Sequence, residues 1–174
     1  MRIQAFTALV LCGALLVFTR PLGAQLAPVA PASPPAQMPF DIPYGTPITL
    51  TAAKAAMSAA EAEARRNNWK MNIAVVDPNG DLVAFERMDG AQLASVQISQ
   101  HKARTAARFR RETFVFEQAV QAGNVYQFTL DGVIASRGGF PLVSGGKIVG
   151  AIGCSGGTGS QDAQSCKAGA DTVH

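Results

Sequence analysis

Histidine is scarce in this sequence, and its scarcity excludes the commonest hydrolytic and metal-dependent active sites. The chain has only two histidines, His101 and His174. A catalytic triad needs an imidazole beside its nucleophile, and zinc sites usually combine several histidine or cysteine ligands. Neither histidine stands in such a pattern, and Ser144 and Ser155 lack the setting of a nucleophile elbow. The residues therefore give no strong signal for a serine hydrolase or for a metal centre made of clustered side chains.

Long apolar runs are confined to the start of the chain. Residues 5–18 are almost wholly apolar, but a membrane-spanning helix needs about 20 such residues. A positively charged start precedes this run and the small residues of Leu22-Gly23-Ala24 follow it, which is typical of a cleaved secretory signal peptide. We therefore expect residues 1–24 to be a signal peptide, the mature protein to be periplasmic or secreted, and no stable membrane insertion after cleavage.

The predicted mature chain has little net charge. Two of the 15 lysines and arginines, Arg2 and Arg20, lie in the signal peptide, which leaves 13 against 12 acidic residues. A net charge near +1 is not the footprint of a nucleic-acid-binding protein. The glycine-rich segment 153–160 also lacks the Gly-Lys-Ser/Thr of a Walker loop. We therefore expect no nucleic-acid partner, and any basic site has to be local.

Prolines cluster just after the predicted signal peptide. Seven of the 10 prolines lie within residues 25–47, and this composition favours extended, solvated chain. We predict that residues 25–47 are a Pro-rich disordered arm. Residues 48–174 are then one domain, long enough to bury a core.

Two cysteines, Cys154 and Cys166, remain after signal cleavage. A disulfide between them would persist in the oxidising compartments to which exported proteins are sent. Two unpaired thiols are the other possibility, and the sequence leaves both open.

The predicted domain alternates helical and hairpin patterns. Apolar residues at three- and four-residue steps predict helices, and apolar runs on either side of Pro78-Asn79-Gly80 and of Gly145-Gly146 predict two hairpins. The expected elements are a helix from Thr49 to Asn67, a hairpin over 71–88, helices over 92–110 and 112–122, a hairpin over 140–154, and a closing helix from its N-cap Ser160 to Val173. This order predicts an α+β fold with an antiparallel sheet of about five strands, flanked by helices in three layers (α/β/α).

The second predicted helix carries His101 and Lys102 beside several arginines. Helical spacing puts His101 and Lys102 near the edge of a packing face and the arginines mostly outward. Lys102 either keeps its ammonium in water or turns it into a cleft toward a carboxylate. His101 is either a structural residue or a ligand, such as the proximal ligand of a haem iron. Arg104 belongs to a solvated surface, a subunit interface or an anion contact.

Glycine-rich segments flank the second hairpin. Gly139 precedes it, and Gly156 and Gly157 follow it, where a strand leads into the start of a helix. Exposed amides and the helix dipole at such a place favour an anion. The second segment is therefore either a flexible connection or a carboxylate-binding loop.

Three stretches together carry a family resemblance: residues 72–90, 99–107 and 138–162. In these stretches, and in their order over residues 49–174, the sequence resembles the GlcG/HbpS family, which includes the C-terminal domain of PduO proteins. The resemblance implies a profilin-like fold, assembly into a homo-oligomer, and haem binding. Some family members are secreted and linked to haem or iron sensing, while others stand beside glycolate or propanediol metabolism.

We therefore expect an exported haem-binding (tetrapyrrole-binding) protein that senses or handles haem or iron, and that is a binding protein rather than an enzyme. His101 is the expected iron ligand, with Lys102 or Arg104 on a propionate. Gly139, Gly156 and Gly157 complete the predicted ligand-binding set. An apolar wall is expected from Ile98, Phe109 or Phe140.

The alternative is a protein that binds a small anionic ligand, either an enzyme on a small carboxylate or an accessory protein of a catabolic pathway. Lys102 and the amides of the second glycine-rich segment would hold the anion. Asp77 or Glu86 would move a proton, provided that it lies within hydrogen-bond reach of the substrate.

Overall fold

Two β-hairpins form the centre of the fold, as the sequence predicts. The structure is a computed structural model that describes residues 33–34 and 36–174. The strands are β1 (Asn72–Val76), β2 (Leu82–Arg87), β3 (Gly139–Ser144) and β4 (Lys147–Ser155). They form one antiparallel sheet in the order β2-β1-β4-β3.

The expectation of about five strands is wrong, because the described residues form a sheet of four. Between the helices and the second hairpin the chain forms a 3-10 helix, η1 (Val125–Thr129), instead of a further strand. Before the domain, Tyr44 makes only an isolated bridge to Ile148. Neither segment extends the sheet.

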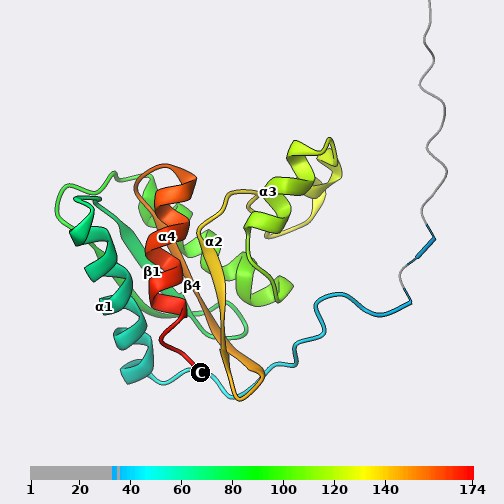
Figure 1. Ribbon diagram of the computed structural model, residues 1–174, viewed down its shortest axis with the longest axis horizontal. Helices are drawn as coiled ribbons and strands as arrows, with labels where there is room; N and C mark the ends of the chain where they lie inside the picture. Colours follow the sequence, from blue (N-terminus) through cyan, green and yellow to red (C-terminus); the bar gives the residue numbers. More distant parts are fainter. Residues whose placement is uncertain (1–32, 35) are drawn as a thin grey trace, which may run out of the picture. The chain divides into compact units, whose positions relative to one another are not determined.

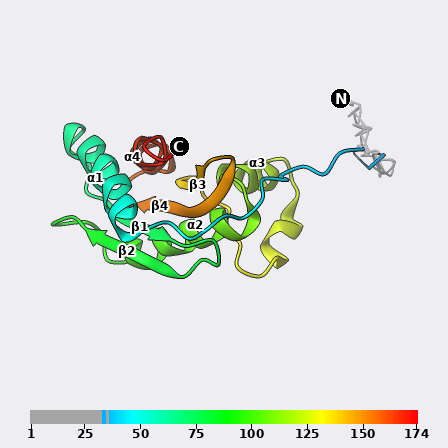
Figure 2. The same ribbon diagram turned by 90° about the horizontal axis from the view of Figure 1, so that it is seen from below.

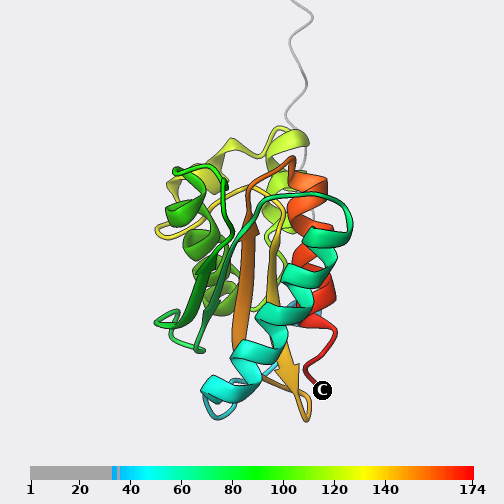
Figure 3. The same ribbon diagram turned by 90° about the vertical axis from the view of Figure 1, so that its left-hand side faces the viewer.

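Helices cover both faces of the sheet, which gives the expected three layers (Figures 2 and 3). Helices α1 (Leu50–Arg66) and α4 (Gly159–Ala170) lie on one face, and α2 (Ser95–Phe109) lies on the other. Strand side chains alternate between faces, so Ile73 and Val75 pack toward α1 and α4 while Ala74 and Val76 pack toward α2. This double burial explains why β1 is apolar from Ile73 to Val76.

Small residues bring α2 very close to the sheet. Ala103, Ala106 and Ala107 are fully buried against it. A Cβ added to Gly153 of β4 would collide with the Ser99 carbonyl of α2. Close packing of this kind fixes the rotation of α2 about its axis, and hence the directions of its basic side chains.

Capping side chains define the starts of α1 and α4, the two helices that share one face of the sheet. The Thr49 side chain accepts a hydrogen bond from Ala52 N at the start of α1. Thr158, not Ser160, is the N-cap of α4, so the predicted cap is wrong. Thr158 forms a capping box with Gln161, in which each side chain accepts a hydrogen bond from the other residue's backbone N–H.

The remaining α-helix, α3 (Phe114–Gln121), lies beyond the β3 side of the sheet (Figures 1 and 2). An edge-to-face contact between Phe109 and Phe116 joins it to α2. The last part of the predicted Pro-rich arm contacts the sheet, where Gly45 N donates to Ile148 O at 2.8 Å. The predicted signal peptide lies outside the described residues. Within residues 36–174, no helix is long and apolar enough to cross a membrane.

The structure pairs Cys154 with Cys166 in a disulfide. The two Cα atoms are 5.4 Å apart, and both residues are fully buried. The bond joins β4 to α4, and so ties a helical layer to the centre of the sheet.

Replacing both cysteines by alanine is expected to lower the free energy of unfolding by about 3 kcal/mol, because the disulfide no longer restricts the unfolded chain. The loss is of this moderate size because the cysteines are only 12 residues apart. Urea denaturation of the oxidised protein and of the variant measures the difference. Adding a reductant should shift the wild-type midpoint toward that of the variant and leave the variant unchanged. Equal midpoints for the oxidised wild type and the variant would contradict a stabilising bond.

Candidate functional site

Two neighbouring residues of α2, His101 and Lys102, point to different parts of the molecule. Lys102 is 1% exposed and reaches toward α4. His101 is half-buried and lines an open cleft on the other side of α2. Helical spacing predicts that both lie near the edge of one packing face, but only Lys102 is buried, and the two residues have different surroundings.

The Lys102 ammonium is bound to a carboxylate that the sequence prediction gives no role. Lys102 Nζ lies 2.7 Å from Asp162 Oδ2, and the two side chains are 1% and 4% exposed. The other oxygen, Asp162 Oδ1, accepts hydrogen bonds from Gly156 N at 3.0 Å and Gly157 N at 2.9 Å. Asp162 stands in the first turn of α4, where the helix dipole also favours an anion. We call these four residues the Lys102–Asp162 centre.

Glycines let the chain pass directly over this centre. Gly138 has a φ of +114°, and a Cβ there would meet both Asp162 and the Lys102 ammonium. A Cβ on Gly139 would collide with the Lys102 carbonyl. Gly139 N donates to Thr113 Oγ1 at 2.9 Å, and Gly139 O accepts from Thr113 N at 3.1 Å. Gly139 therefore serves in close packing against α2 in this structure.

The Lys102–Asp162 centre thus brings together Lys102, Gly156 and Gly157, with Gly139 against it. The groups predicted to hold an external carboxylate hold one supplied by the chain itself. Lys102 and Asp162 are almost wholly buried, so this ion pair joins α2 to α4 inside the protein.

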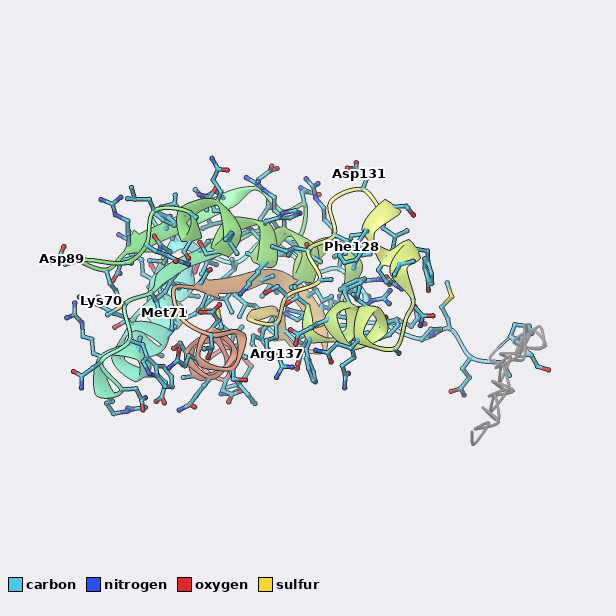
Figure 4. All side chains as sticks on the ribbon, turned by 90° about the horizontal axis from the view of Figure 1, so that it is seen from above. Lys70, Met71, Asp89, Phe128, Asp131 and Arg137 are labelled. Carbon is cyan, nitrogen blue, oxygen red and sulfur yellow. A yellow bond between two sulfur atoms is a disulfide. The ribbon has the colours of Figure 1, made fainter. Side chains whose placement is uncertain are left out.

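A second ion pair, between Glu117 of α3 and Arg137, borders the same junction. Arg137 Nη2 lies 2.5 Å from Glu117 Oε1, and its guanidinium stacks 4.2 Å from the centre of the Phe114 ring. Figure 4 shows Arg137 between α3 and α4. Hydrogen bonds from the Arg137 side chain lower the pKa of Glu117, and the charge of Lys102 contributes to the same shift.

This lowered pKa predicts a loss of stability in acid. The Glu117 carboxylate stabilises the fold above its unfolded-state pKa of about 4.3, and this contribution is lost as the pH falls through the lower folded-state pKa. Melting temperatures measured across this range should therefore fall less steeply for Glu117→Gln than for the wild type. Parallel curves for the two proteins would contradict the role of the pair.

The cleft beside His101 lies on the outer side of α2. It has a volume of about 480 Å³ and is lined by Gln97, Gln100, His101, Arg104, Arg108 and Gly132. Arg104 Nε donates to Gly80 O at 3.2 Å, and Arg108 Nε donates to Asn79 O at 2.7 Å. Within residues 36–174 neither arginine forms an ion pair with a carboxylate, so no carboxylate partner occupies either guanidinium at the cleft. We call it the His101 cleft.

A more apolar hollow continues along the same side of α2. It has a volume of about 660 Å³, shares Gln97 with the His101 cleft, and is otherwise lined by Arg87, Leu93, Ala94, Val96 and Ile98. Ile98 is therefore near the site, as expected. Phe109 instead packs on Phe116, and Phe140 is buried on the β3 side of the sheet, so neither supplies the predicted wall.

Asp77 and Glu86, which the small-carboxylate alternative predicts to move a proton, both lie in the first hairpin. Asp77 Oδ1 accepts hydrogen bonds from Asn79 N and Asp81 N in the turn of the first hairpin. Burial and the nearby Glu61 carboxylate raise the pKa of Glu86 on β2. Neither residue hydrogen-bonds a member of the Lys102–Asp162 centre.

Ser155 occupies the third position of a Gly-Cys-Ser-Gly-Gly stretch, but its surroundings are not those of a nucleophile. It is 3% exposed, and its hydroxyl donates to Ser95 Oγ at 2.9 Å. In the part of the chain that the structure describes, no three His, Cys, Asp or Glu side chains gather as metal ligands would. The side chains therefore offer binding groups, chiefly an imidazole with two guanidiniums.

Comparison with known proteins identifies relatives across this domain. The family model described as "Haem degrading protein HbpS-like" matches residues 48–171. Protein GlcG of Escherichia coli K12 is 47% identical over 103 residues, which are 59% of this chain and 77% of GlcG. A 15.0 kDa protein from the dhaT-dhaS intergenic region of Citrobacter freundii is 40% identical over 119 residues, 66% of this chain and 84% of that protein.

Solved structures share the fold. Protein ORFY of Klebsiella pneumoniae has a TM-score of 0.68 at 34% identity and covers 73% of this chain and 90% of its own. A double mutant of HbpS from Streptomyces reticuli has a TM-score of 0.67 at 31% identity, and the match covers 82% of this chain and 98% of HbpS. A PduOC–heme complex has a TM-score of 0.67 at 23% identity and covers 74% and 96%, a likeness of fold alone.

Proposed function

Because the chain belongs to the HbpS-like family, we propose that it is an exported haem-binding protein whose haem lies on the outer side of α2. The observation that carries this proposal is the His101 cleft, in which an imidazole stands beside two arginines that pair with no carboxylate among the described residues. Neutral imidazole is a common haem-iron ligand, and guanidiniums bind carboxylates such as the haem propionates.

The residues along α2 suit an amphipathic, dianionic molecule such as haem. The apolar residues around Val96 and Ile98 precede His101, and the arginines follow it. His101 and Arg108 are two helical turns apart, about 10 Å along the axis. Haem would supply its own iron chemistry there, while this chain would supply a ligand, propionate contacts and an apolar surface.

Two further observations support the proposal. The PduOC–heme complex indicates that this fold accommodates a haem in one protein. The disulfide between Cys154 and Cys166 suits the oxidising environment of an exported protein. We further propose a role in sensing or handling haem or iron, as the family resemblance implies.

The alternative, binding of a small carboxylate by Lys102 and the glycine amides, has less support. Asp162 already fills the position that a bound carboxylate would take. We also propose that the protein is a homo-oligomer. The exposed side chains of Val125, Tyr126 and Phe128 in and around η1 are available for such an interface.

Spectral titration of residues 25–174 with hemin tests the proposed function. We expect a saturable Soret band, and no thermal stabilisation by acetate, glycolate or pyruvate. Stabilisation by one of these acids without a Soret band would contradict the proposal and favour the alternative.

The arginines are tested in the same titration. Arg104→Gln combined with Arg108→Gln should weaken hemin binding by about tenfold or more, because each guanidinium–carboxylate contact is charge-assisted. The dimethyl ester of hemin, which has no propionate charge, should bind wild type and double variant alike. A loss of affinity that is equal for hemin and its ester would contradict propionate contacts.

A further inference from the structure

A second binding site lies on the β3 side of the sheet. A groove of about 440 Å³ runs there between α3, the edge strand β3 and the end of α4. Figure 2 shows β3 between these two helices. Its lining is mostly apolar and includes Phe40, Val115, Phe140, Pro141, Val143 and Val173. We call it the β3 groove; it shares no lining residue with the His101 cleft.

One cation in this groove, Arg111, has no ion-pair partner among the described residues. The Arg111 guanidinium lies 3.5 Å from the centre of the Phe40 ring and 5.3 Å from that of Phe116. Its Nε donates to Phe109 O, and within residues 36–174 it pairs with no carboxylate. Burial, and then the charge of Arg110, lower the pKa of Arg111, so an anion placed here would relieve an unfavourable environment.

Phe40 is held against Arg111 at a conformational cost. Its φ is +65°, a value that bulky residues rarely adopt. Backbone strain of this kind persists where the surroundings impose it, and it is concentrated at ligand clamps and other functional sites. Here it places an aromatic ring over the guanidinium at the end of the groove.

The other charges of the groove are engaged or exposed. Lys167 pairs with Asp171 at 2.6 Å, and Arg110 lies 3.9 Å from Asp41. Glu112 is exposed and forms no ion pair with the described residues. The groove therefore combines one unpaired, partly desolvated cation with an apolar wall.

We propose that the β3 groove binds an amphipathic carboxylate, with its head group on Arg111 and its apolar chain along β3. Charge complementarity favours a carboxylate over a neutral lipid. Addition of a further strand is disfavoured, because Pro141 has no N–H to offer at this edge. The proposal is independent of the haem proposed for the His101 cleft.

Calorimetric titration of residues 25–174 with dodecanoate, below its micelle concentration, tests the proposal. We expect saturable binding to one site, and affinities for dodecanol and for acetate that are lower by about tenfold or more. Arg111→Gln should weaken dodecanoate binding by a similar factor. Arg66→Gln, which removes an exposed arginine at the end of α1 that lines none of these clefts, should leave it unchanged.

Val143→Trp provides a second test that leaves Arg111 in place. It should abolish dodecanoate binding by filling the groove, and it decides the matter if Arg111→Gln does not fold. Absence of saturable binding, or wild-type affinity in either groove variant, would overturn the proposal. So would loss of dodecanoate binding in His101→Ala, because it would place the ligand in the His101 cleft.

Discussion

Replacing Asp162 by asparagine is expected to lower the free energy of unfolding by about 3–5 kcal/mol, because it leaves the Lys102 ammonium buried without a counter-charge. Asparagine keeps the shape of the side chain, and its carbonyl oxygen can still accept from the Gly156 and Gly157 amides. The change therefore keeps the contacts with the glycine amides and removes both the charge and the oxygen that accepts from Lys102. Chemical denaturation followed by circular dichroism measures it.

Asp171→Asn is the matched control for this experiment. It removes the same charge from an exposed pair, in which Lys167 and Asp171 are each 60% exposed. Such pairs contribute less than about 1 kcal/mol. Combining Asp162→Asn with Lys102→Met should recover part of the lost stability, since no charge is then left buried. Similar costs for Asp162→Asn and Asp171→Asn would contradict the structural role of the Lys102–Asp162 centre.

Replacing His101 by alanine is expected to shift the Soret band and to weaken hemin binding by at least about tenfold. Mutating a residue that hydrogen-bonds a metal ligand typically weakens metal binding by about 10–100-fold. Removing the ligand itself should weaken binding by at least as much. Spectral titration measures both quantities in one experiment.

His174→Ala is the control for His101, because it removes the other histidine of the chain. His174 is an exposed residue that lines neither the His101 cleft nor the β3 groove. We expect this variant to bind hemin with the wild-type spectrum and affinity. Equal effects of the two substitutions would remove His101 from the site.

Local patterns were sufficient to predict the hairpins and helices. Pro78-Asn79-Gly80 and Gly145-Gly146 supply the positive φ angles that tight turns need, and Gly80, Gly145 and Gly146 all adopt them. The order of the predicted elements indicated a sheet flanked by helices in three layers. The cap of α4 was misplaced because Thr158 and Ser160 are equally good caps, and only the side chain of Gln161 selects Thr158.

Long-range pairing explains what the sequence did not reveal about the site. Lys102 and Asp162 are 60 residues apart, and no local pattern joins them. Adjacent residues of a helix point about 100° apart, so His101 can face a cleft while Lys102 faces the buried Asp162, although they share one charged stretch. The position of Asp162 in the first turn of a helix after a glycine-rich segment was the one available signal for its role.

The most direct test of haem ligation uses the scarcity of histidine. In residues 25–174 carrying His174→Ala, His101 is the only imidazole, and it can be labelled with ¹⁵N. Electron–nuclear double resonance of the ferric haem complex then measures the coupling between the iron and this nitrogen. Our account predicts the strong ¹⁵N coupling of an iron-bound imidazole. A bound haem with no ¹⁵N coupling would contradict it.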